Sequence, residues 1–281
     1  MKARPALISQ PMRLAQAAFF LCLASLLPLA TAHSTSEQDP VAMVTVPAGM
    51  FQMGSPEGTG GTDEHPQRTL YLEGFAIDQV EVTNAQYRRF VKATGHKPPP
   101  NPYGKGPLFS VKGIEHLPVV QVTWHDASDY CQWAGKRLPS EAEWEKAARG
   151  TDGRLFPWGN EPPTPTHANF GHDWEDLKTL HPVGSHPQGN SPYGVSDMAG
   201  NAREWVLDTY DQDFFQTAPD RNPRGPEQGV LKGIRGGSWH HGSNDIRAAM
   251  RGKGGFALKT DGTGFRCARD AADSPEQRRT P

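Results

Sequence analysis

The chain has 281 residues, with 29 Lys and Arg against 31 Asp and Glu and a formal net charge of −2. No basic stripe accompanies this balance, so nucleic acid is excluded as an expected partner. Glycine and proline contribute 30 and 26 residues, yet 7 Trp and 12 Phe suffice for a hydrophobic core. These totals predict a single loop-rich domain of about 230 residues.

The start of the chain, residues 1–32, has the pattern of a signal peptide. Basic residues, the last of them Arg13, precede an apolar run at 14–29, and small residues at 30–32 suit a signal peptidase. Pro28 interrupts the run, which is shorter than the roughly 20 residues of a membrane-spanning helix. We therefore expect cleavage after residue 32, no stable membrane anchor, and a periplasmic or secreted protein.

The exported chain divides into three parts. Residues 33–42 are polar and without periodicity, which predicts a disordered leader. The folded domain is expected at 43–270. Residues 271–281 form a polar tail that we expect to be frayed.

The first part of the domain has the alternation of β-strands. Residues 43–55 contain short β-type runs that break at Pro47 and stop at Gly54, which predicts a hairpin. A flexible loop is expected at 58–63. Residues 70–82 then alternate apolar and polar side chains, as a half-buried strand pair would.

A helix is predicted next, from its capping residue and apolar spacing. It begins at Thr83 or Asn84 and ends before Gly95. The segment 96–106 is rich in proline and glycine, so it is expected to be a surface loop.

Two further helices start with capping boxes, in which side-chain oxygens meet otherwise unpaired backbone amides. We expect them to begin after Thr123 and Ser140, and the second to end at Gly150. Beyond residue 160, helical turns are expected only around 202–206 and 247–251.

Two cysteines, Cys131 and Cys267, remain after export. The helical spacing of Ala127, Tyr130 and Cys131 directs Cys131 inward. In an oxidising compartment an even count favours a disulfide, which would close a loop of about 136 residues and contribute roughly 5 kcal/mol by the chain-entropy model. Two buried free thiols are the alternative.

The densest chemistry lies in residues 234–251. A strand enters at Ile234, and the pair Gly236-Gly237 allows the backbone to turn. A hydroxyl, an indole and two imidazoles follow directly, at Ser238, Trp239, His240 and His241. No GxSxG elbow surrounds the serine, so we do not expect it to be a nucleophile.

Charged residues follow this cluster. We expect Arg247 and Arg251 to form buried ion pairs with Asp261 or Glu204. The alternative is that Asp245 and the two arginines bind a charged group of a substrate.

Eight sequence blocks, in order, resemble the formylglycine-generating enzyme family, also called the sulfatase-modifying-factor domain. They are VPAGMFQMGS (46–55), DEHP (63–66), EVTNAQY (81–87), PVVQVTWHDASDYCQWAGKRLPSEAEWEKAARG (118–150), LFPWGN (155–160), YGVSDMAGNAREW (193–205), RGGSW (235–239) and GFRCARD (264–270). The resemblance covers about residues 43–270. It implies an α+β fold, a single C-type-lectin-like domain with many loops, short strands and few helices, and a disulfide between Cys131 and Cys267.

The resemblance also implies structural calcium, bound through carboxylate and backbone oxygens that suit a hard cation. The first site would comprise Asp197, Gly200, Ala202 and Glu204. The second would comprise Asn169, Phe170 and Asp176, although the spacing between Asn169 and Pro182 departs from the family's pattern. Turns held by ordinary hydrogen bonds are the alternative at both places.

One departure from the family concerns its chemistry. In the sulfatase-activating members, two cysteines after GGS bind copper(I) and oxidise a substrate cysteine, because thiolates suit a soft redox-active ion. The matching positions here are His241 and Ile246, so we predict that this chain does not generate formylglycine. Copper or iron at His240 and His241 stays open as a cofactor without cysteine ligands, but neighbours on a strand face opposite ways unless the loop bends. Alternatively, Trp239 is core and the histidines line a polar groove.

Two functions are therefore weighed. The first is an exported oxidative tailoring enzyme acting on a small molecule or peptide, as in the maturation of a pyoverdine-type siderophore chromophore. In that enzyme His240 or His241 is the catalytic base, and the substrate is bound by Ser238, Trp239 and Asp245. The second is a non-catalytic, calcium-stabilised binding or accessory module with a protein partner, for example one associated with nitrite reductase.

Overall fold

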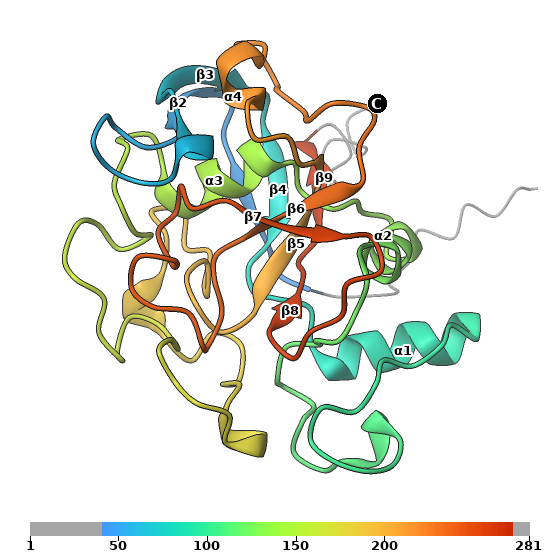
Figure 1. Ribbon diagram of the computed structural model, residues 1–281. Coiled ribbons are helices and arrows are strands. Elements are labelled where there is room, and N and C mark those ends of the chain that lie inside the picture. Colours follow the sequence, from blue (N-terminus) through green and yellow to red (C-terminus); the bar gives the residue numbers. More distant parts are fainter. Residues whose placement is uncertain (1–40, 272–281) are drawn as a thin grey trace, which may run out of the picture. The chain divides into compact units, whose positions relative to one another are not determined.

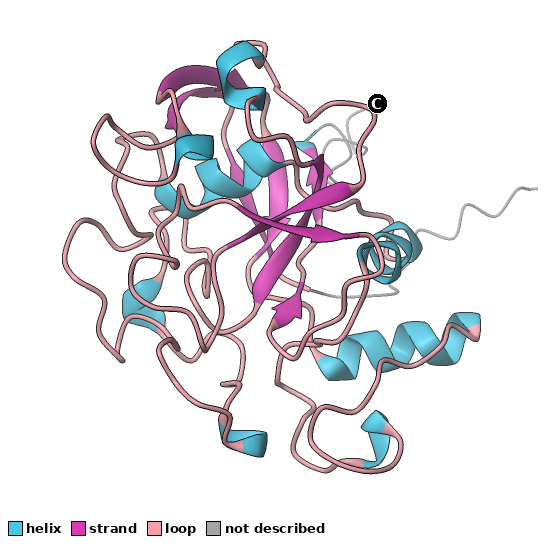
Figure 2. Ribbon diagram, in the orientation of Figure 1, coloured by secondary structure: helices cyan, strands magenta, loops and turns pink. Residues whose placement is uncertain are grey.

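The computed structural model describes residues 41–271, which belong to one compact unit. The predicted signal peptide at 1–32, the leader up to residue 40 and the tail from 272 lie outside the described residues. Within 41–271, four α-helices and nine short strands alternate with long irregular loops (Figure 2). The predicted α+β class with few helices and short strands is confirmed. No helix of this range has the length and apolar character needed to cross a bilayer.

The first four strands pair in a nested order, and β1 and β2 do not form the hairpin predicted at 43–55. They are β1 (Met43–Val46), β2 (Gly49–Met53), β3 (Arg68–Leu72) and β4 (Phe75–Asp78). β2 pairs with β3, and β1 pairs with β4, both antiparallel. The prediction was wrong because apolar partners distant in sequence, such as Phe51 opposite Leu70 and Val46 opposite Phe75, bury more surface than a local turn would.

β4 is fully buried, and not half-buried as its alternation suggests. It is the central strand of the sheet β1-β4-β9, in which β9 (Ala268–Asp270) pairs with its second edge. All four of its residues, including Asp78, are buried. The C-terminal end of the described chain therefore closes a sheet that its N-terminal end begins (Figure 1).

The second sheet carries the chemistry-bearing loop. Its order is β7-β6-β5-β8, with β5 (Arg203–Thr209), β6 (Leu231–Arg235), β7 (Gly252–Gly255) and β8 (Thr263–Gly264). The helical turns predicted at 202–206 and 247–251 are wrong: the first is strand β5 and the second consists of turns. Both Trp205 and Val206 are buried, in different core clusters, so the strand lacks the period-two pattern that would have identified it.

The helices begin where their capping residues predict. α1 (Asn84–Thr94), α2 (Trp124–Trp133) and α3 (Glu141–Arg149) are capped by the hydroxyls of Thr83, Thr123 and Ser140. α1 ends at Gly95 and α3 at Gly150, both with positive φ. The remaining helical elements are short: α4 (Phe214–Thr217), and the 3₁₀ turns η1 (Thr62–Glu64), η2 (Leu108–Ser110), η3 (Asp176–Lys178) and η4 (Pro187–Gly189).

α3 is buried along its whole length, although five of its nine residues are charged. Its acidic side chains are paired in the interior: Glu141 accepts from Arg235 and Arg251, and Glu145 accepts from Arg235 and Arg149. These pairs join α3 to strand β6, where Arg235 is the last residue. Arg251 therefore pairs with Glu141, and Asp261 and Glu204 were the wrong partners for it.

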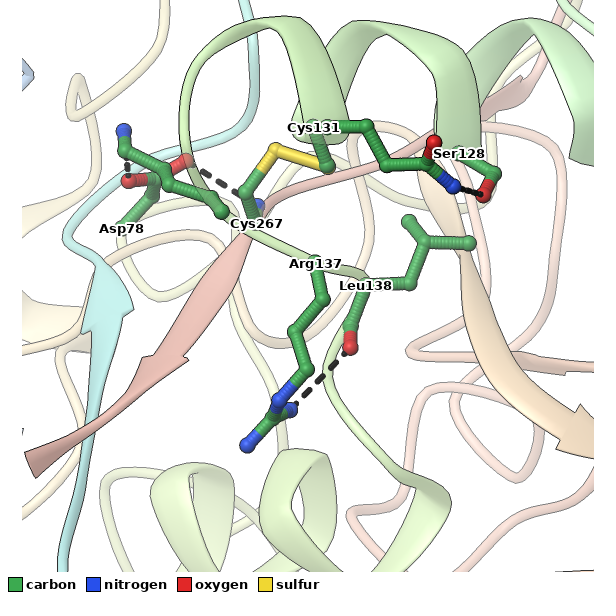
Figure 3. Close-up of a disulfide and its surroundings, with 8 residues drawn as sticks. Asp78, Ser128, Cys131, Arg137, Leu138 and Cys267 are labelled. Atoms are coloured by element: carbon green, nitrogen blue, oxygen red, sulfur yellow. Dashed lines mark hydrogen bonds and ion pairs between the residues drawn. A yellow bond between two sulfur atoms is a disulfide. The ribbon is translucent and has the colours of Figure 1, made fainter. Parts of the chain in front are cut away.

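The predicted disulfide between Cys131 and Cys267 is present (Figure 3). It joins α2 to the segment before β9, with 5.6 Å between the two Cα atoms. The Cys267 N–H donates to the buried carboxylate of Asp78 in β4, at 3.0 Å. The disulfide thus links α2 to the first sheet, and its two cysteines are 136 residues apart in the sequence.

We predict that replacing both cysteines, in Cys131→Ala/Cys267→Ala, lowers the free energy of unfolding by about 2–5 kcal/mol, because the cross-link limits the unfolded chain. Urea unfolding of the two proteins measures the difference. Reduced wild-type protein should match the double variant. Equal unfolding midpoints for oxidised and reduced wild type would contradict the prediction.

Candidate functional site

The candidate site is a loop that leaves β6 through two glycines in left-handed conformations, with φ of 89° at Gly236 and 66° at Gly237. A Cβ atom at Gly237 would lie 2.7 Å from the carbonyl oxygen of Asp245, so the loop folds back on itself at this point. The Trp239 N–H donates to the Asn201 carbonyl at 2.9 Å, which fixes the loop beside the start of β5.

Two of the predicted substrate-binding residues lie inside the protein. Ser238 is 0% exposed and Trp239 6%, and the indole packs in a cluster with Leu180 and Ala202. The indole Nε1–H donates to the Asp261 carbonyl at 3.4 Å. Both side chains therefore position the loop, and a ligand would meet the residues beyond them.

The histidines at 240 and 241 share one hydroxyl group. The Nδ1 atoms of His240 and His241 each lie 3.0 Å from the Ser238 Oγ, and their rings are 4.1 Å apart. Adjacent side chains on a straight strand would face opposite ways, but the glycine turn bends the backbone so that both rings reach the serine. This bend is the condition for the two imidazoles to act together.

The hydrogen bonds assign the tautomers. The Ser238 backbone N–H donates to His241 Nδ1 at 3.0 Å, so this nitrogen is an acceptor and the proton of His241 is on Nε2. We infer that the Ser238 hydroxyl also donates to this nitrogen, because two acceptors would otherwise face each other at 3.0 Å. Since the hydroxyl has a single proton, His240 Nδ1–H donates to it, and the free lone pair of His240 is on Nε2.

Both imidazoles are neutral at neutral pH. Burial, the charge of Arg203 and the charge that His240 would carry if protonated together lower the pKa of His241 to about 4. Burial and Arg203 also lower the pKa of His240. Asp245, which is half-buried, acts in the opposite direction on both. The pair therefore offers an unprotonated Nε2 on exposed His240 and an Nε2–H donor on His241.

An aromatic wall, defined as Tyr103, Trp174, Trp239 and His240, adjoins the imidazoles. The successive ring centroids are 5.9, 5.5 and 4.9 Å apart. Hydrogen bonds from Gly171 and His172 to the site loop hold the segment of Trp174 in place. Trp174 is half-exposed, so it is the indole that a ligand can contact. The sequence analysis missed Trp174, because nothing local links it to residues 65 positions later.

Arg247 anchors the far end of the loop. It forms an ion pair with Glu64, at 2.7 Å, and not with Asp261 or Glu204 as predicted. Burial alone would raise the pKa of Glu64, but hydrogen bonds from Arg247, Ser55 and the Gly61 N–H outweigh it and lower the pKa to about 2. Arg247 is therefore committed to the protein and is not free to bind a ligand.

No cluster of three or more His, Cys, Asp or Glu side chains suited to a metal ion occurs within residues 41–271. His240 and His241 are thus two imidazoles without a third protein ligand of these types. This donor set does not fit a copper or iron ion held by the protein.

The first set predicted to bind calcium comprises Asp197, Gly200, Ala202 and Glu204. The Glu204 carboxylate accepts from Arg266 through both oxygens, at 2.7 and 2.8 Å, and from Trp144 Nε1 at 2.8 Å. The buried guanidinium would repel a cation at the same carboxylate. Glu204 therefore fits an internal ion pair better than a calcium ligand.

A second carboxyl group, which the sequence analysis missed, lies beside Asp197. Burial raises the pKa of Glu81 well above its usual range, and the Asp197 carboxylate raises it further. Glu81 Oε1 accepts from Asn201 Nδ2 at 3.0 Å. A carboxyl group that resists ionisation next to Asp197 provides less negative charge there than two free carboxylates would.

The second calcium set, Asn169, Phe170 and Asp176, fits a hard cation better. Asn169 donates through Nδ2 to the Thr179 carbonyl and to Asn201, while its buried Oδ1 has no hydrogen-bond partner within 41–271. The Thr179 N–H in turn donates to the Asp176 carbonyl, so Asn169 and Asp176 lie on neighbouring segments. An unpaired buried amide oxygen beside an acidic turn suits calcium.

The amino-acid sequence is similar to those of several known proteins. The family model of the sulfatase-modifying factor enzyme 1-like domain matches residues 29–271. The Formylglycine-generating enzyme of Thermomonospora curvata is 35% identical over 283 residues, which cover 81% of this chain and 93% of that protein. The Serine/threonine-protein kinase pkn1 of Chlamydia caviae is 38% identical over 242 residues, but the chain spans only 38% of its length.

A solved structure has the same fold. The structure of PvdO from Pseudomonas aeruginosa is 31% identical in sequence and superposes with a TM-score of 0.72. The match covers 84% of this chain and 96% of that one.

We predict that imidazole nitrogen shifts in NMR spectra show the Nδ1–H tautomer for His240 and the Nε2–H tautomer for His241 between pH 6.5 and 8. Replacing the hydroxyl, in Ser238→Ala, should return His240 to the Nε2–H form that free histidine prefers, because its acceptor is lost. His241 should keep its tautomer, since the backbone N–H remains. An Nε2–H tautomer for His240 in the wild type would contradict the assignment.

Proposed function

The chain belongs to the family of the sulfatase-modifying factor enzyme 1-like domain, in the branch without the two copper-binding cysteines, and from this we propose an oxidative maturation function. The protein would be exported and would oxidise an aromatic small molecule or a peptide, in the manner of siderophore-chromophore maturation. It would not generate formylglycine. The likeness to PvdO over nearly all of both chains supports this branch of the family.

The observation that carries the proposal is the neutral imidazole of exposed His240, which packs against Trp239, as does the half-exposed ring of Trp174. A substrate whose aromatic ring stacks on the indole would have a neutral base near its hydroxyl group, because burial lowers the pKa of His240. A cysteine-based reaction has no thiol available within 41–271, because Cys131 and Cys267 are joined to each other. The site therefore favours proton transfer from an aromatic substrate over thiolate chemistry.

The reaction balances with dioxygen as the oxidant. A catechol-type substrate loses two electrons and two protons to become a quinone, and dioxygen accepts the two electrons and the two protons to become hydrogen peroxide. His240 Nε2 accepts the first proton as the substrate gives up its electrons, and His241 Nε2–H donates a hydrogen bond to an oxygen that gains negative charge. We assign no step to copper or iron, because the donor set does not fit either ion.

Export and calcium complete the proposal. The basic and apolar pattern of residues 1–32 supports a periplasmic or secreted location. The unpaired Oδ1 of Asn169 supports a structural calcium ion at Asn169, Phe170 and Asp176. No nucleic acid is expected as partner.

We predict that the purified protein oxidises a catechol-type substrate with release of hydrogen peroxide, and that His240→Ala lowers kcat/KM by about 10²–10⁴-fold. The rate should be flat between pH 7 and 8 and fall on acidification, because the base must be unprotonated. His116→Ala, at an exposed histidine distant in sequence, is the matched control. Aldehyde formation on a sulfatase peptide, or equal rates for His240→Ala and wild type, would contradict the proposal.

We predict that calcium raises the thermal unfolding midpoint and that a chelator reverses the gain, since an ion bound only by the folded state stabilises it. Asn169→Asp should alter the calcium-dependent increment, whereas magnesium should not replace calcium. An increment of zero in wild type would contradict the site. Calcium binding without oxidase activity would instead support an accessory binding module.

A further inference from the structure

Arg203, the first residue of β5, is a half-buried cation without an acidic partner. No Asp or Glu oxygen of residues 41–271 lies within ion-pair distance of its guanidinium, although the other buried arginines, such as Arg235 and Arg266, are paired with carboxylates. Its side chain donates only to hydroxyls, from Nε to Thr263 at 2.7 Å and from Nη2 to Thr260 at 3.4 Å. Burial of an unpaired charge is unfavourable, which calls for an explanation.

The fold brings Arg203 to the site loop through β8. The Arg203 N–H donates to the Gly262 carbonyl at 2.9 Å, and Arg203 lies opposite Thr263 in the parallel β5–β8 register. A Cβ atom at Gly262 would lie 2.7 Å from the Ser238 Oγ and 3.1 Å from the Trp239 Nε1. One backbone segment therefore separates Arg203 from the loop that carries the histidines.

The positive charge of Arg203 affects the pKa values of the two imidazoles. It contributes to the lowered pKa of His240 and of His241, and Asp245 acts on both imidazoles in the opposite direction. Asp261 is close enough to raise the pKa of Arg203 but not to form an ion pair, and burial, the larger effect, lowers that pKa. A cation therefore lies close enough to the site loop to act on both of its imidazoles.

We propose that Arg203 is the subsite for a carboxylate carried by the aromatic substrate. The identity of the ligand rests on the proposed function. The subsite itself concerns the binding of the ligand and not its oxidation. Thr260 and Thr263 hold one side of the guanidinium fork, and Nη1 donates no hydrogen bond within 41–271. A planar fork with a free edge matches a carboxylate, and the ring of such a ligand would lie toward the site loop. The substrate class is therefore an aromatic carboxylic acid.

The test compares two ligands that differ in one charge, 3,4-dihydroxyphenylacetate and its neutral amide, in calorimetric titrations without oxygen. Wild type should bind the acid at least tenfold more tightly than the amide. Arg203→Gln should remove this difference by weakening the acid alone, and Arg203→Lys should keep part of it. Arg88→Gln, the same charge change on the exposed face of α1, should leave both affinities unchanged.

Equal binding of acid and amide by wild type would overturn the proposal, as would equal weakening of both in Arg203→Gln or binding of neither. The melting temperature of each variant shows whether it is folded. Because binding is measured without oxygen, its result is independent of the oxidase test. Selective binding of the acid without any oxidation would support the Arg203 subsite and contradict the proposed reaction.

Discussion

The buried ion pairs between Arg235 and helix α3 are the constraint on which the site depends. Arg235 is fully buried and donates to Glu141 at 2.9 Å, to Glu145 at 2.6 Å and to the Ala248 carbonyl at 2.7 Å. Removing one partner would leave a buried charge uncompensated, at a cost of about 3–5 kcal/mol. Because Arg235 directly precedes Gly236, these contacts fix both the point where the site loop leaves β6 and, through Ala248, the point where it returns.

The rest of the loop is held in the same way. Arg251 shares Glu141 with Arg235, and Arg247 is paired with Glu64, whose low pKa keeps it ionised at any pH above about 4.5. Charges inside the protein therefore clamp a segment that is otherwise turns, without regular backbone hydrogen bonding. A loop fixed at several points can hold Ser238 and both imidazoles in one arrangement, which precise proton transfer requires.

Interactions between residues close in sequence, such as helix caps, were predictable, whereas the pairing of strands distant in sequence was not. Thr83, Thr123 and Ser140 cap helices through atoms three residues away, so the sequence contains the whole interaction. The disulfide followed from an even cysteine count and from the resemblance. The nested pairing of β1 with β4 and the strand at Trp205 depend instead on surfaces buried by distant segments. For the same reason the histidines were found, whereas Arg203 and Trp174, brought in by β8 and by the 171–174 segment, were missed.

The presence of His241 and Ile246, where the sulfatase-activating members have cysteines, changes what the scaffold can contribute. Thiolates bind a soft metal and carry electrons, whereas neutral imidazoles with lowered pKa values move protons and accept hydrogen bonds. The shared Ser238 hydroxyl couples the two rings, so protonation of His240 at Nε2 is felt at His241 through a single oxygen. In such a site the electrons must pass between substrate and oxidant directly. In the proposed reaction the protein would bind a substrate that is easily oxidised once it loses a proton, and the aromatic surface and the cation near the base would serve that binding.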